Sequence, residues 1–286
     1  MDSLKVHKLI HRDRYPIDDV SSVSCRRTIA QVRKELDEDG CAVVKGFLSS
    51  EGLKLLRAEA VDRLPQTHYS KKKKCNVYLG DSNPARPSDH PQNTFLERTN
   101  GFVTADTFGE ESLSRQLYYW PPLKEFLRRC LNKRALYIYE DPVSNMIVNV
   151  ARRGQNFNWH FDTNEFTITM LLQAAEQGGV FEYVPNLRQK RDERYSAVKR
   201  VLDGDRSAVK PLELNPGDLQ LFLGRYSLHQ VTPNEGATER LLLIMSFAET
   251  PNMVGSRVRV QDLYGKVAEV HMSKEKDLTR ADQLLD

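Results

Sequence analysis

The sequence has few of the features that mark secreted, zinc-stabilised or membrane-bound proteins. Its four cysteines show no C-x-x-C spacing and no tight cluster, so they predict neither a structural zinc site nor a disulfide framework: Cys25, Cys41, Cys75 and Cys130. No run approaches the roughly 18 apolar residues that a membrane-spanning helix needs, and the charged start lacks the apolar segment of a signal peptide. We therefore expect a soluble, cytoplasmic protein with reduced thiols and no membrane partner.

The sequence also lacks an excess of charge of one sign. Lysine and arginine number 42 against 39 aspartate and glutamate residues, which leaves a net charge of +3. This balance gives no global electrostatic reason to expect binding to nucleic acid or to a membrane surface. The run from Lys71 to Lys74 is the most conspicuous local cluster, and we interpret it as a solvated loop rather than a nuclear address. A small-molecule partner is the remaining expectation, and the oligomeric state stays open.

The most informative motif is a set of metal-ligating residues in the second half of the chain. His160 and Asp162 stand two residues apart, and a second histidine, His229, follows further along the sequence. Two imidazoles and one carboxylate occupy one face of an octahedral ion and leave the opposite face free for a co-substrate and O2. The pattern therefore predicts the ligand set of a non-haem Fe(II) site.

Chance is a real alternative for an H-x-D match, because the sequence contains seven histidines. His11 and Asp13 form a second H-x-D in a charged stretch without strand alternation, and we interpret that pair as solvated surface. Its H-R-D spelling also occurs in kinase catalytic loops, but no glycine-rich phosphate loop or D-F-G accompanies it. His160 and Asp162 differ because a buried-strand pattern at residues 146–150 precedes them, and in an extended strand both would project to one side.

The residues around this motif predict short strands separated by tight turns. Residues 166–173, 180–185, 219–223 and 241–247 are rich in β-branched and apolar side chains, and Gly-Gly or Pro-Gly turns lie between them. Short strands therefore fill residues 135–250. This pattern predicts a mainly β fold with a small double-sheet barrel or jelly-roll core.

Helices are expected to cover the outer faces of these sheets. One should begin after an N-cap serine, Ser49, and end at Pro65, and a second should span residues 122–132. A charged insert at residues 188–210 carries apolar residues at helical spacing, which predicts a surface helix.

The length of 286 residues is enough to bury one substantial core, and we expect a single domain over residues 1–286. Residues 1–134 would form a helical, loop-rich support and lid region, residues 135–250 the barrel core, and residues 251–286 a C-terminal tail. The stretch 66–108 reads mostly as loop, and loops of that length often bind ligands or act as lids.

A family resemblance rests on several elements in a fixed order: H-x-D, then G-G-x-F-x-x-x-P, P-G-D-L-x-x-F, the distal His229 and finally Arg240. The block from Ile147 to Phe247 resembles the double-stranded β-helix of Fe(II)/2-oxoglutarate-dependent dioxygenases. Residues 36–48 are similar to the N-terminal segment of the phytanoyl-type members. The resemblance implies a cupin-like, jelly-roll core with flanking helices, Fe(II) as the metal, and 2-oxoglutarate and O2 as co-substrates.

The resemblance also implies roles for single residues. His160, Asp162 and His229 would hold Fe(II), and Arg240 would clamp the distal carboxylate of 2-oxoglutarate. Independently of the family, a buried guanidinium at Arg240 suits a dicarboxylate because its donors form a planar fork. Asn149 and Thr169 are candidate hydrogen-bonding helpers for the co-substrate.

A finer resemblance is to the branch that hydroxylates or halogenates small free amino acids, carried by residues 160–173, 181–186 and 247–251. Halogenases of this branch replace the carboxylate ligand by a small residue so that halide can bind iron, whereas Asp162 occupies the position here. The resemblance therefore implies a hydroxylase of a small polar metabolite, a free amino acid in particular. The alternatives are the same chemistry on a larger natural product or macromolecule, desaturation or ring formation, and a non-catalytic jelly-roll binding protein.

Three further residues are candidate substrate contacts. Arg98 lies between apolar residues and a turn, where its cation could reach a substrate carboxylate, although pairing with Glu97 or another acid is the alternative. Arg225 would lie on the His229 side of an extended strand, with the same alternative. Tyr264, in the C-terminal tail, is a candidate wall of the pocket.

Overall fold

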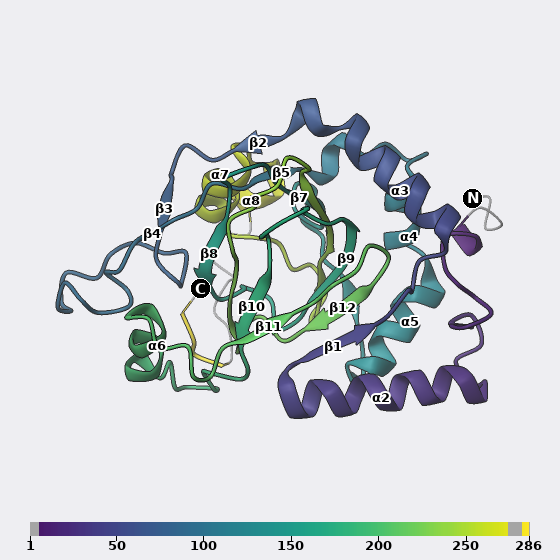
Figure 1. Cartoon of the computed structure of the whole chain (residues 1–286), viewed down its shortest axis with the longest axis horizontal. Helices are drawn as coiled ribbons and strands as arrows, with labels where there is room; N and C mark the ends of the chain where they lie inside the picture. The colour runs from purple at the N-terminus through teal and green to yellow at the C-terminus, as the bar shows by residue number, and fades with distance from the viewer. Residues whose placement is uncertain (1–5, 274–281, 286) are drawn as a thin grey trace.

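Two antiparallel β-sheets form the core of the protein, and Figure 1 shows them as the central barrel of the computed structural model. The structure describes residues 6–273 and 282–285. The strands of the larger sheet are β1 (Cys41–Val44), β2 (His68–Tyr69), β5 (Gly101–Val103), β7 (Met146–Ala151), β9 (Thr167–Gln173), β12 (Leu219–Phe222) and β14 (Arg240–Met245). The strands of the smaller sheet are β8 (Phe157–His160), β10 (Phe181–Val184), β11 (Lys210–Leu212) and β13 (Leu228–Val231). Their spatial orders are β1-β12-β9-β14-β7-β5-β2 and β11-β10-β13-β8, and with the flanking helices they make the expected double-stranded β-helix.

The larger sheet is buried on both faces. At its centre β14 pairs with both β7 and β9, so that Leu243 stands opposite Val148 and Met170. Because side chains alternate along a strand, Leu243 packs into the helix-covered core while Ile244 packs with the inner cluster that faces the smaller sheet. Burial on both faces explains why this part of the sequence is an almost continuous apolar run.

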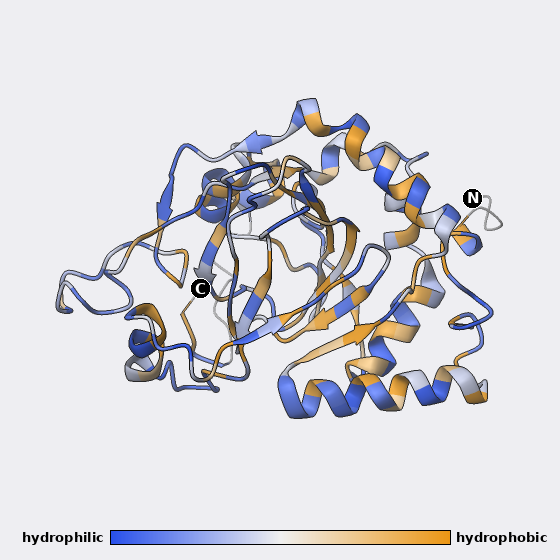
Figure 2. Cartoon of the chain, in the orientation of Figure 1, coloured by the Kyte–Doolittle hydropathy of each residue, from blue (hydrophilic) through white to orange (hydrophobic). Residues whose placement is uncertain are grey.

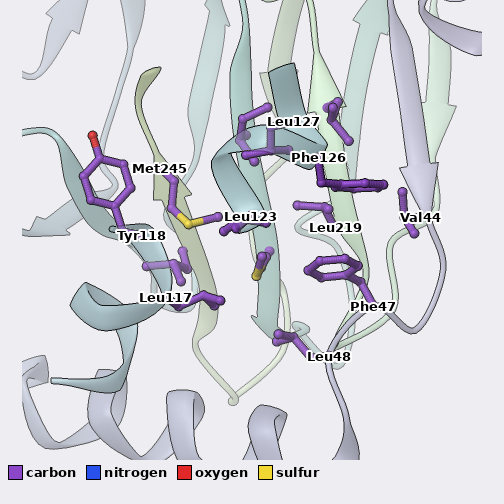
Figure 3. Close-up of a cluster of buried hydrophobic side chains, with 14 of the residues drawn as sticks. Val44, Phe47, Leu48, Leu117, Tyr118, Leu123, Phe126, Leu127, Leu219 and Met245 are labelled. Carbon is purple, nitrogen blue, oxygen red and sulfur yellow. The ribbon is translucent and has the colours of Figure 1, made fainter. Parts of the chain in front are cut away.

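Helices cover the outer face of the larger sheet (Figure 1). They are α2 (Val23–Asp39), α3 (Ser50–Asp62), α4 (Leu113–Tyr118) and α5 (Pro121–Cys130). In Figure 3 Phe126 and Leu127 of α5 lie among side chains of the sheet and of the segment around Phe47, and the Phe47 and Phe126 rings stack at 6.1 Å. Truncating a buried leucine such as Leu127 to alanine in a core of this kind costs roughly 2–5 kcal/mol. This packing fixes the sheet on which the candidate site is built.

The predicted helices are confirmed. Ser49 caps α3 by accepting a hydrogen bond from the backbone N–H of Gly52 at 2.9 Å, and Pro65 lies in the 3-10 turn η1 (Leu64–Gln66) that follows. The second predicted helix is α5, whose inner face is buried: Leu123, Phe126, Leu127 and Cys130. The charged insert forms α6 (Tyr195–Leu202), and Figure 2 shows hydrophobic and hydrophilic residues alternating along it, as on the longer α2.

Residues 66–108 contain more regular structure than the loop that the sequence predicts. Besides β2 and β5 they form β3 (Lys74–Cys75), β4 (Leu96–Glu97) and the 3-10 turn η2 (Ala105–Thr107). The short lengths of these strands, with two or three residues each, explain why no periodicity revealed them. The remaining elements are β6 (Tyr137–Ile138), which pairs with β15 (Phe247–Ala248), and the C-terminal helices α7 (Arg257–Tyr264) and α8 (Glu269–Ser273).

The strand that carries the first metal-ligand candidate ends earlier than expected. The sequence predicts one extended segment through Asp162, but β8 ends at His160. Beyond it the backbone N–H of Phe161 donates to the carbonyl of Val77, and that of Asp162 to the carbonyl of Gly224. Two loops therefore accept the backbone hydrogen bonds that a neighbouring strand would otherwise accept, and they position the Asp162 carboxylate. Within the described residues, no helix is long and apolar enough to cross a membrane.

Candidate metal centre and adjoining cavities

Three side chains predicted as metal ligands converge at the inner face of the smaller sheet. His160 on β8 and His229 on β13 are cross-strand partners, and Asp162 follows in the loop after β8. One ligand atom from each residue lies within 4.8 Å of the other two. The Nε2 atoms of His160 and His229 lie 3.9 and 3.5 Å from Oδ1 of Asp162. In the described part of the chain this is the one group of its kind, and the other H-x-D pair, at His11, is exposed.

Backbone carbonyls orient both imidazoles. Nδ1 of His160 lies 2.7 Å from the carbonyl oxygen of Asn158, and Nδ1 of His229 lies 3.0 Å from that of Ser227. A carbonyl oxygen accepts the proton of Nδ1, which leaves the Nε2 lone pair of each ring facing the shared centre. Burial lowers the pKa of His160 to about 3, so this ring is neutral at physiological pH, as a metal ligand must be.

The carboxylate of Asp162 is held from two sides. Burial acts to raise its pKa, but His229, His160 and the Thr167 hydroxyl outweigh burial and keep the pKa well below its usual range. Thr167 donates a hydrogen bond of 2.6 Å to Oδ2 of Asp162. On the other side a Cβ on Gly224 would lie 1.9 Å from the same oxygen, so only glycine leaves room for the carboxylate there. Sequence reasoning missed Thr167 and Gly224.

Aromatic rings pack against the imidazoles and exclude water from their flanks. The ring of Phe157 stacks on His160 with centroids 3.7 Å apart and planes 9° apart. The ring of Phe222 meets His229 edge-on at 4.8 Å. These contacts fix the ring orientations, and they place the metal candidates against the apolar cluster between the two sheets.

Arg240 is a buried cation without an acidic partner. Its side chain begins β14 and is 3% exposed, and its guanidinium makes no hydrogen bond or ion pair with any residue that the structure describes. Burial lowers its pKa to about 10. Gly179 makes room for the side chain, since a Cβ there would lie 3.1 Å from Cδ of Arg240. Because an unpaired buried charge costs several kcal/mol, this arrangement fits an anionic ligand such as the carboxylate of 2-oxoglutarate.

Asn149 and Thr169, the two candidate hydrogen-bonding residues for the co-substrate, differ in their surroundings. Asn149 stands opposite Leu242 on the inner face of the larger sheet, on the same side as Arg240, and its Oδ1 accepts a hydrogen bond of 3.3 Å from Asn100. In this orientation the Nδ2 donors of Asn149 remain available. Thr169, in contrast, donates its hydroxyl to Oε1 of Gln220 at 2.9 Å.

A main cavity of about 120 Å³ opens next to the metal candidates. His160 and Asp162 line it together with Tyr264, the expected pocket wall, whose ring meets Phe102 at 5.2 Å. The helix α7 covers part of it through Arg259, which also donates to the carbonyl of Tyr78 at 3.0 Å. Sequence reasoning did not find Arg259, because it lies in a helix without a motif.

Arg98 lies beside the main cavity, in a side cavity of about 20 Å³. The two cavities share Leu79, Arg259 and Leu263 as lining residues. The Arg98 side chain is 3% exposed, and its Nε and Nη1 have no hydrogen-bond partner among the described residues. Its guanidinium lies 5.7 Å from the ring centroid of Phe157, which itself stacks on His160. Glu97, the acid named as an alternative partner, is exposed.

Arg225 has a different environment from Arg98 and Arg240. It forms a buried ion pair with Asp282, whose Oδ1 lies 2.8 Å from its Nη2, and it donates to the carbonyl of Thr163 at 3.0 Å. It does not line either cavity. Arg225 therefore pairs with an acid, which was the alternative to a substrate contact. Its hydrogen bond to Thr163 also supports the loop after Asp162.

The jelly-roll core brings two imidazoles and one carboxylate together at His160, His229 and Asp162, and a solved oxidoreductase of the 2OG-Fe(II) oxygenase family has a similar fold. The chain belongs to the Halogenase D family, which matches residues 25–259. No curated protein matches the sequence.

Several solved structures share the fold. The epimerase SnoN, in complex with Fe3+, alpha ketoglutarate and nogalamycin RO, is 16% identical with a TM-score of 0.52, over 86% of this chain and 92% of that chain. The non-heme alpha ketoglutarate dependent carbocyclase SnoK from nogalamycin biosynthesis is 14% identical with a TM-score of 0.53, over 76% of this chain and 82% of that chain. An oxidoreductase of the 2OG-Fe(II) oxygenase family from Burkholderia pseudomallei is 16% identical with a TM-score of 0.50, over 78% and 91%. At these identities the likeness shows a common fold.

Proposed function

We propose that the protein is an Fe(II)/2-oxoglutarate-dependent hydroxylase of a free amino acid. The observation that carries the proposal is the Asp162 carboxylate beside two oriented imidazoles, with the unpaired Arg240 guanidinium on the same inner surface. When bound, Fe(II) with 2-oxoglutarate and O2 supplies the oxidation of an unactivated C–H bond, coupled to conversion of 2-oxoglutarate to succinate and CO2. The contribution of the protein is to hold these groups, position the substrate and exclude water.

Each ligand-binding role falls to a residue with a physical reason for it. His160, His229 and Asp162 would hold the metal through Nε2, Nε2 and a carboxylate oxygen. Arg240 would pair with the distal carboxylate of 2-oxoglutarate, since its donors have no partner in the described protein. Asn149 would add an amide donor, because Asn100 occupies its oxygen.

The intact carboxylate favours hydroxylation over halogenation within the Halogenase D family. A halogenase needs an open ligand position for halide, and here Asp162 occupies that position. Thr167 and Gly224 reinforce the carboxylate, since one donates to it and the other leaves space for it. If a halide replaced this ligand, the protein would have no carboxylate for Thr167 and Gly224 to position.

The cations beside the main cavity support an amino acid as the substrate. Arg98 is buried with unsatisfied donors in the side cavity that adjoins the main cavity, so it offers a counter-charge for a substrate carboxylate. The volume of about 120 Å³ favours a small metabolite over a larger natural product. An engineered protein cavity of roughly 150 Å³ holds one benzene molecule, which sets the scale.

The test is a succinate-release assay with purified protein, Fe(II), 2-oxoglutarate and a panel of free amino acids, followed by mass analysis of the products. We expect one or a few amino acids to stimulate succinate release strongly and to gain one oxygen atom. Asp162→Ala should abolish this turnover, whereas His11→Ala, which removes the exposed histidine of the other H-x-D pair, should not change it.

The outcomes separate the alternatives. Stimulation by no free amino acid would contradict the proposed substrate class and favour a larger substrate. Succinate release that survives Asp162→Ala would contradict the ligand assignment. A product that carries chlorine when chloride is present would show halogenation instead of hydroxylation.

A further inference from the structure

We infer that the main cavity selects an amino acid with a small, neutral, largely aliphatic side chain and rejects one with a basic side chain. This inference rests on the proposed function and deepens it, because it names the substrate class within the amino acids. It follows from the charges that line the cavity, from the pairing of the neighbouring acids that the structure describes, and from the volume of the cavity.

The lining offers no counter-ion for a basic side chain. Among the described residues that line the main cavity, Asp162 is the only carboxylate; its Oδ1 faces the two histidines and its Oδ2 accepts from Thr167. The other charged side chain among these lining residues is the guanidinium of Arg259, which is itself a cation. Burial raises the pKa of Tyr264, a tyrosine on the wall, so its hydroxyl adds no negative charge.

Asp141 is a buried acid next to Gly255 of the cavity wall, and both of its carboxylate oxygens have partners. It is 0% exposed, and its Oδ2 lies 2.9 Å from Nε2 of His271 and accepts from the backbone N–H of Gly255 at 3.0 Å. Its Oδ1 accepts from the backbone N–H groups of Val143 and Ser144, each at 2.9 Å. Asp141 therefore anchors α8 and the neighbouring turns, and it cannot turn toward the cavity without leaving these donors unpaired.

The other neighbouring acids are paired with lysines. Glu165, three positions after Asp162, lies 2.7 Å from Nζ of Lys133, and Glu249 lies 3.0 Å from the same nitrogen. Neither lines the main cavity.

On the other side, Asp262 of α7 lies 3.1 Å from Nζ of Lys72. This contact also gives the lysine run at residues 71–74 a structural role, because one of its members ties α7 to the loop beside the cavity.

The far wall is apolar with a few neutral hydrogen-bonding groups. Ile147 of β7 and Ile244 of β14 stand opposite each other on the inner face and both line the cavity. Ser144, just before β7, and Ser246, just after β14, add two hydroxyls at the same end of this strand pair. Methyl and methylene groups can pack against such a wall, and its hydroxyls can hydrogen-bond one neutral polar group. An ammonium group placed there would lose its hydration without gaining an anionic partner, which is unfavourable.

The volume of the main cavity favours a small side chain. If roughly 150 Å³ holds the six carbons of benzene, about 120 Å³ corresponds to a side chain of about five heavy atoms. Leucine, isoleucine, valine, methionine and norleucine have side chains of this size or smaller. The side chain of ornithine also has this size, so only the charge of its ammonium group can distinguish it from the neutral side chains.

The decisive comparison is norleucine against ornithine. Their side chains have the same number of heavy atoms and differ only in the terminal methyl or ammonium group, so any difference reports charge. We expect kcat/KM for succinate release to be at least about a hundredfold higher with norleucine, since an uncompensated buried charge carries a penalty of that order or more. Calorimetric titration of each amino acid into the anaerobic complex with Fe(II) and 2-oxoglutarate should show the same order in Kd, independently of turnover.

A matched pair of variants tests the cause. Ser246→Asp places a carboxylate in the wall, whereas Ser246→Asn adds the same volume without charge. We expect Ser246→Asp to shift the norleucine-to-ornithine ratio toward ornithine by at least about tenfold, and Ser246→Asn to leave the ratio near that of the unmodified protein.

The results distinguish this inference from the proposed function. Ornithine or lysine used as well as norleucine by the unmodified protein would overturn the neutral-side-chain inference while leaving amino-acid hydroxylation intact. No stimulation and no binding by any amino acid would overturn the proposed substrate class, and this inference with it. An equal shift of the ratio in both Ser246 variants would show that volume, not charge, governs the selection.

Discussion

Replacing Arg240 by methionine should stabilise the ligand-free protein and at the same time destroy its affinity for 2-oxoglutarate. Burial lowers the pKa of Arg240 from 12.5 to about 10. At 1.36 kcal/mol for each tenfold change in proton affinity, this corresponds to a destabilisation of about 3 kcal/mol at neutral pH. Because the pKa is lower in the folded than in the unfolded state, the penalty is present at every pH below about 10 and disappears as the pH rises toward 12.5. Methionine fills similar space without the charge.

The loss of 2-oxoglutarate binding follows from the same charge. Removing one partner of a buried ion pair costs about 2–5 kcal/mol, so the Kd for 2-oxoglutarate should rise by about a hundredfold in Arg240→Met. Urea denaturation of the ligand-free protein measures the first effect. Anaerobic calorimetry with Fe(II) present measures the second, and Fe(II) affinity should change little because Arg240 is not among the metal candidates.

Arg225→Met is the matched control, because Arg225 is equally buried but is paired with Asp282. This variant should lower the free energy of unfolding by roughly 3–5 kcal/mol, since it leaves a buried carboxylate without its partner. The reasoning is refuted if Arg240→Met destabilises the ligand-free protein as Arg225→Met does, or if it binds 2-oxoglutarate as tightly as the unmodified protein.

Three further substitutions test neighbouring groups. Gly224→Ala brings a Cβ to 1.9 Å from an oxygen of Asp162, so we expect Fe(II) binding at least about tenfold weaker by anaerobic calorimetry; unchanged affinity would mean that the carboxylate has room to move. Thr167→Val removes the 2.6 Å hydrogen bond to the same carboxylate and should weaken Fe(II) binding about 10- to 100-fold, whereas Thr167→Ser should retain it, and equal losses in both would point to packing instead. Burial and Glu249 raise the pKa of Glu165 from 4.5 to about 7, so the folded state gains a proton and loses stability as the pH rises through that range. The stability of Glu165→Gln relative to the unmodified protein should therefore increase from pH 5 to pH 8 in urea denaturation, and a constant difference would contradict this account.

The candidate metal ligands could be predicted from the sequence, because the pattern that marks them lies within a few residues or follows a fixed order along the chain. His160 and Asp162 lie within one short motif, and the strand that carries His229 brings it opposite His160 by ordinary cross-strand pairing. The helices were predictable for the same reason, since a capping serine and an apolar stripe mark α3 and α5 within a few residues. The similarity of residues 36–48 to the phytanoyl-type members stays a prediction.

The groups that position the carboxylate were not predictable, because they depend on distant parts of the chain. Gly224 matters only because the loop before β13 passes close to Asp162 and leaves no space for a side chain. Thr167 was visible as a polar residue at the start of β9, but only the early end of β8 at His160 turns Asp162 toward it. Arg259 approaches the cavity through the packing of α7, which carries no motif.

The buried arginines show most clearly what the structure adds to the sequence. In the sequence, Arg240 is the candidate for 2-oxoglutarate, whereas Arg98 and Arg225 are candidate substrate contacts for which pairing with an acid is the alternative. In the fold, Arg225 has a carboxylate from the C-terminal segment, whereas Arg98 and Arg240 have no acidic partner among the described residues. Burying two guanidinium groups without acidic partners carries a desolvation penalty that anionic ligands would relieve. In the proposed reaction 2-oxoglutarate would pair with Arg240 and the substrate carboxylate with Arg98, so the proposal supplies one anion for each of these two cations.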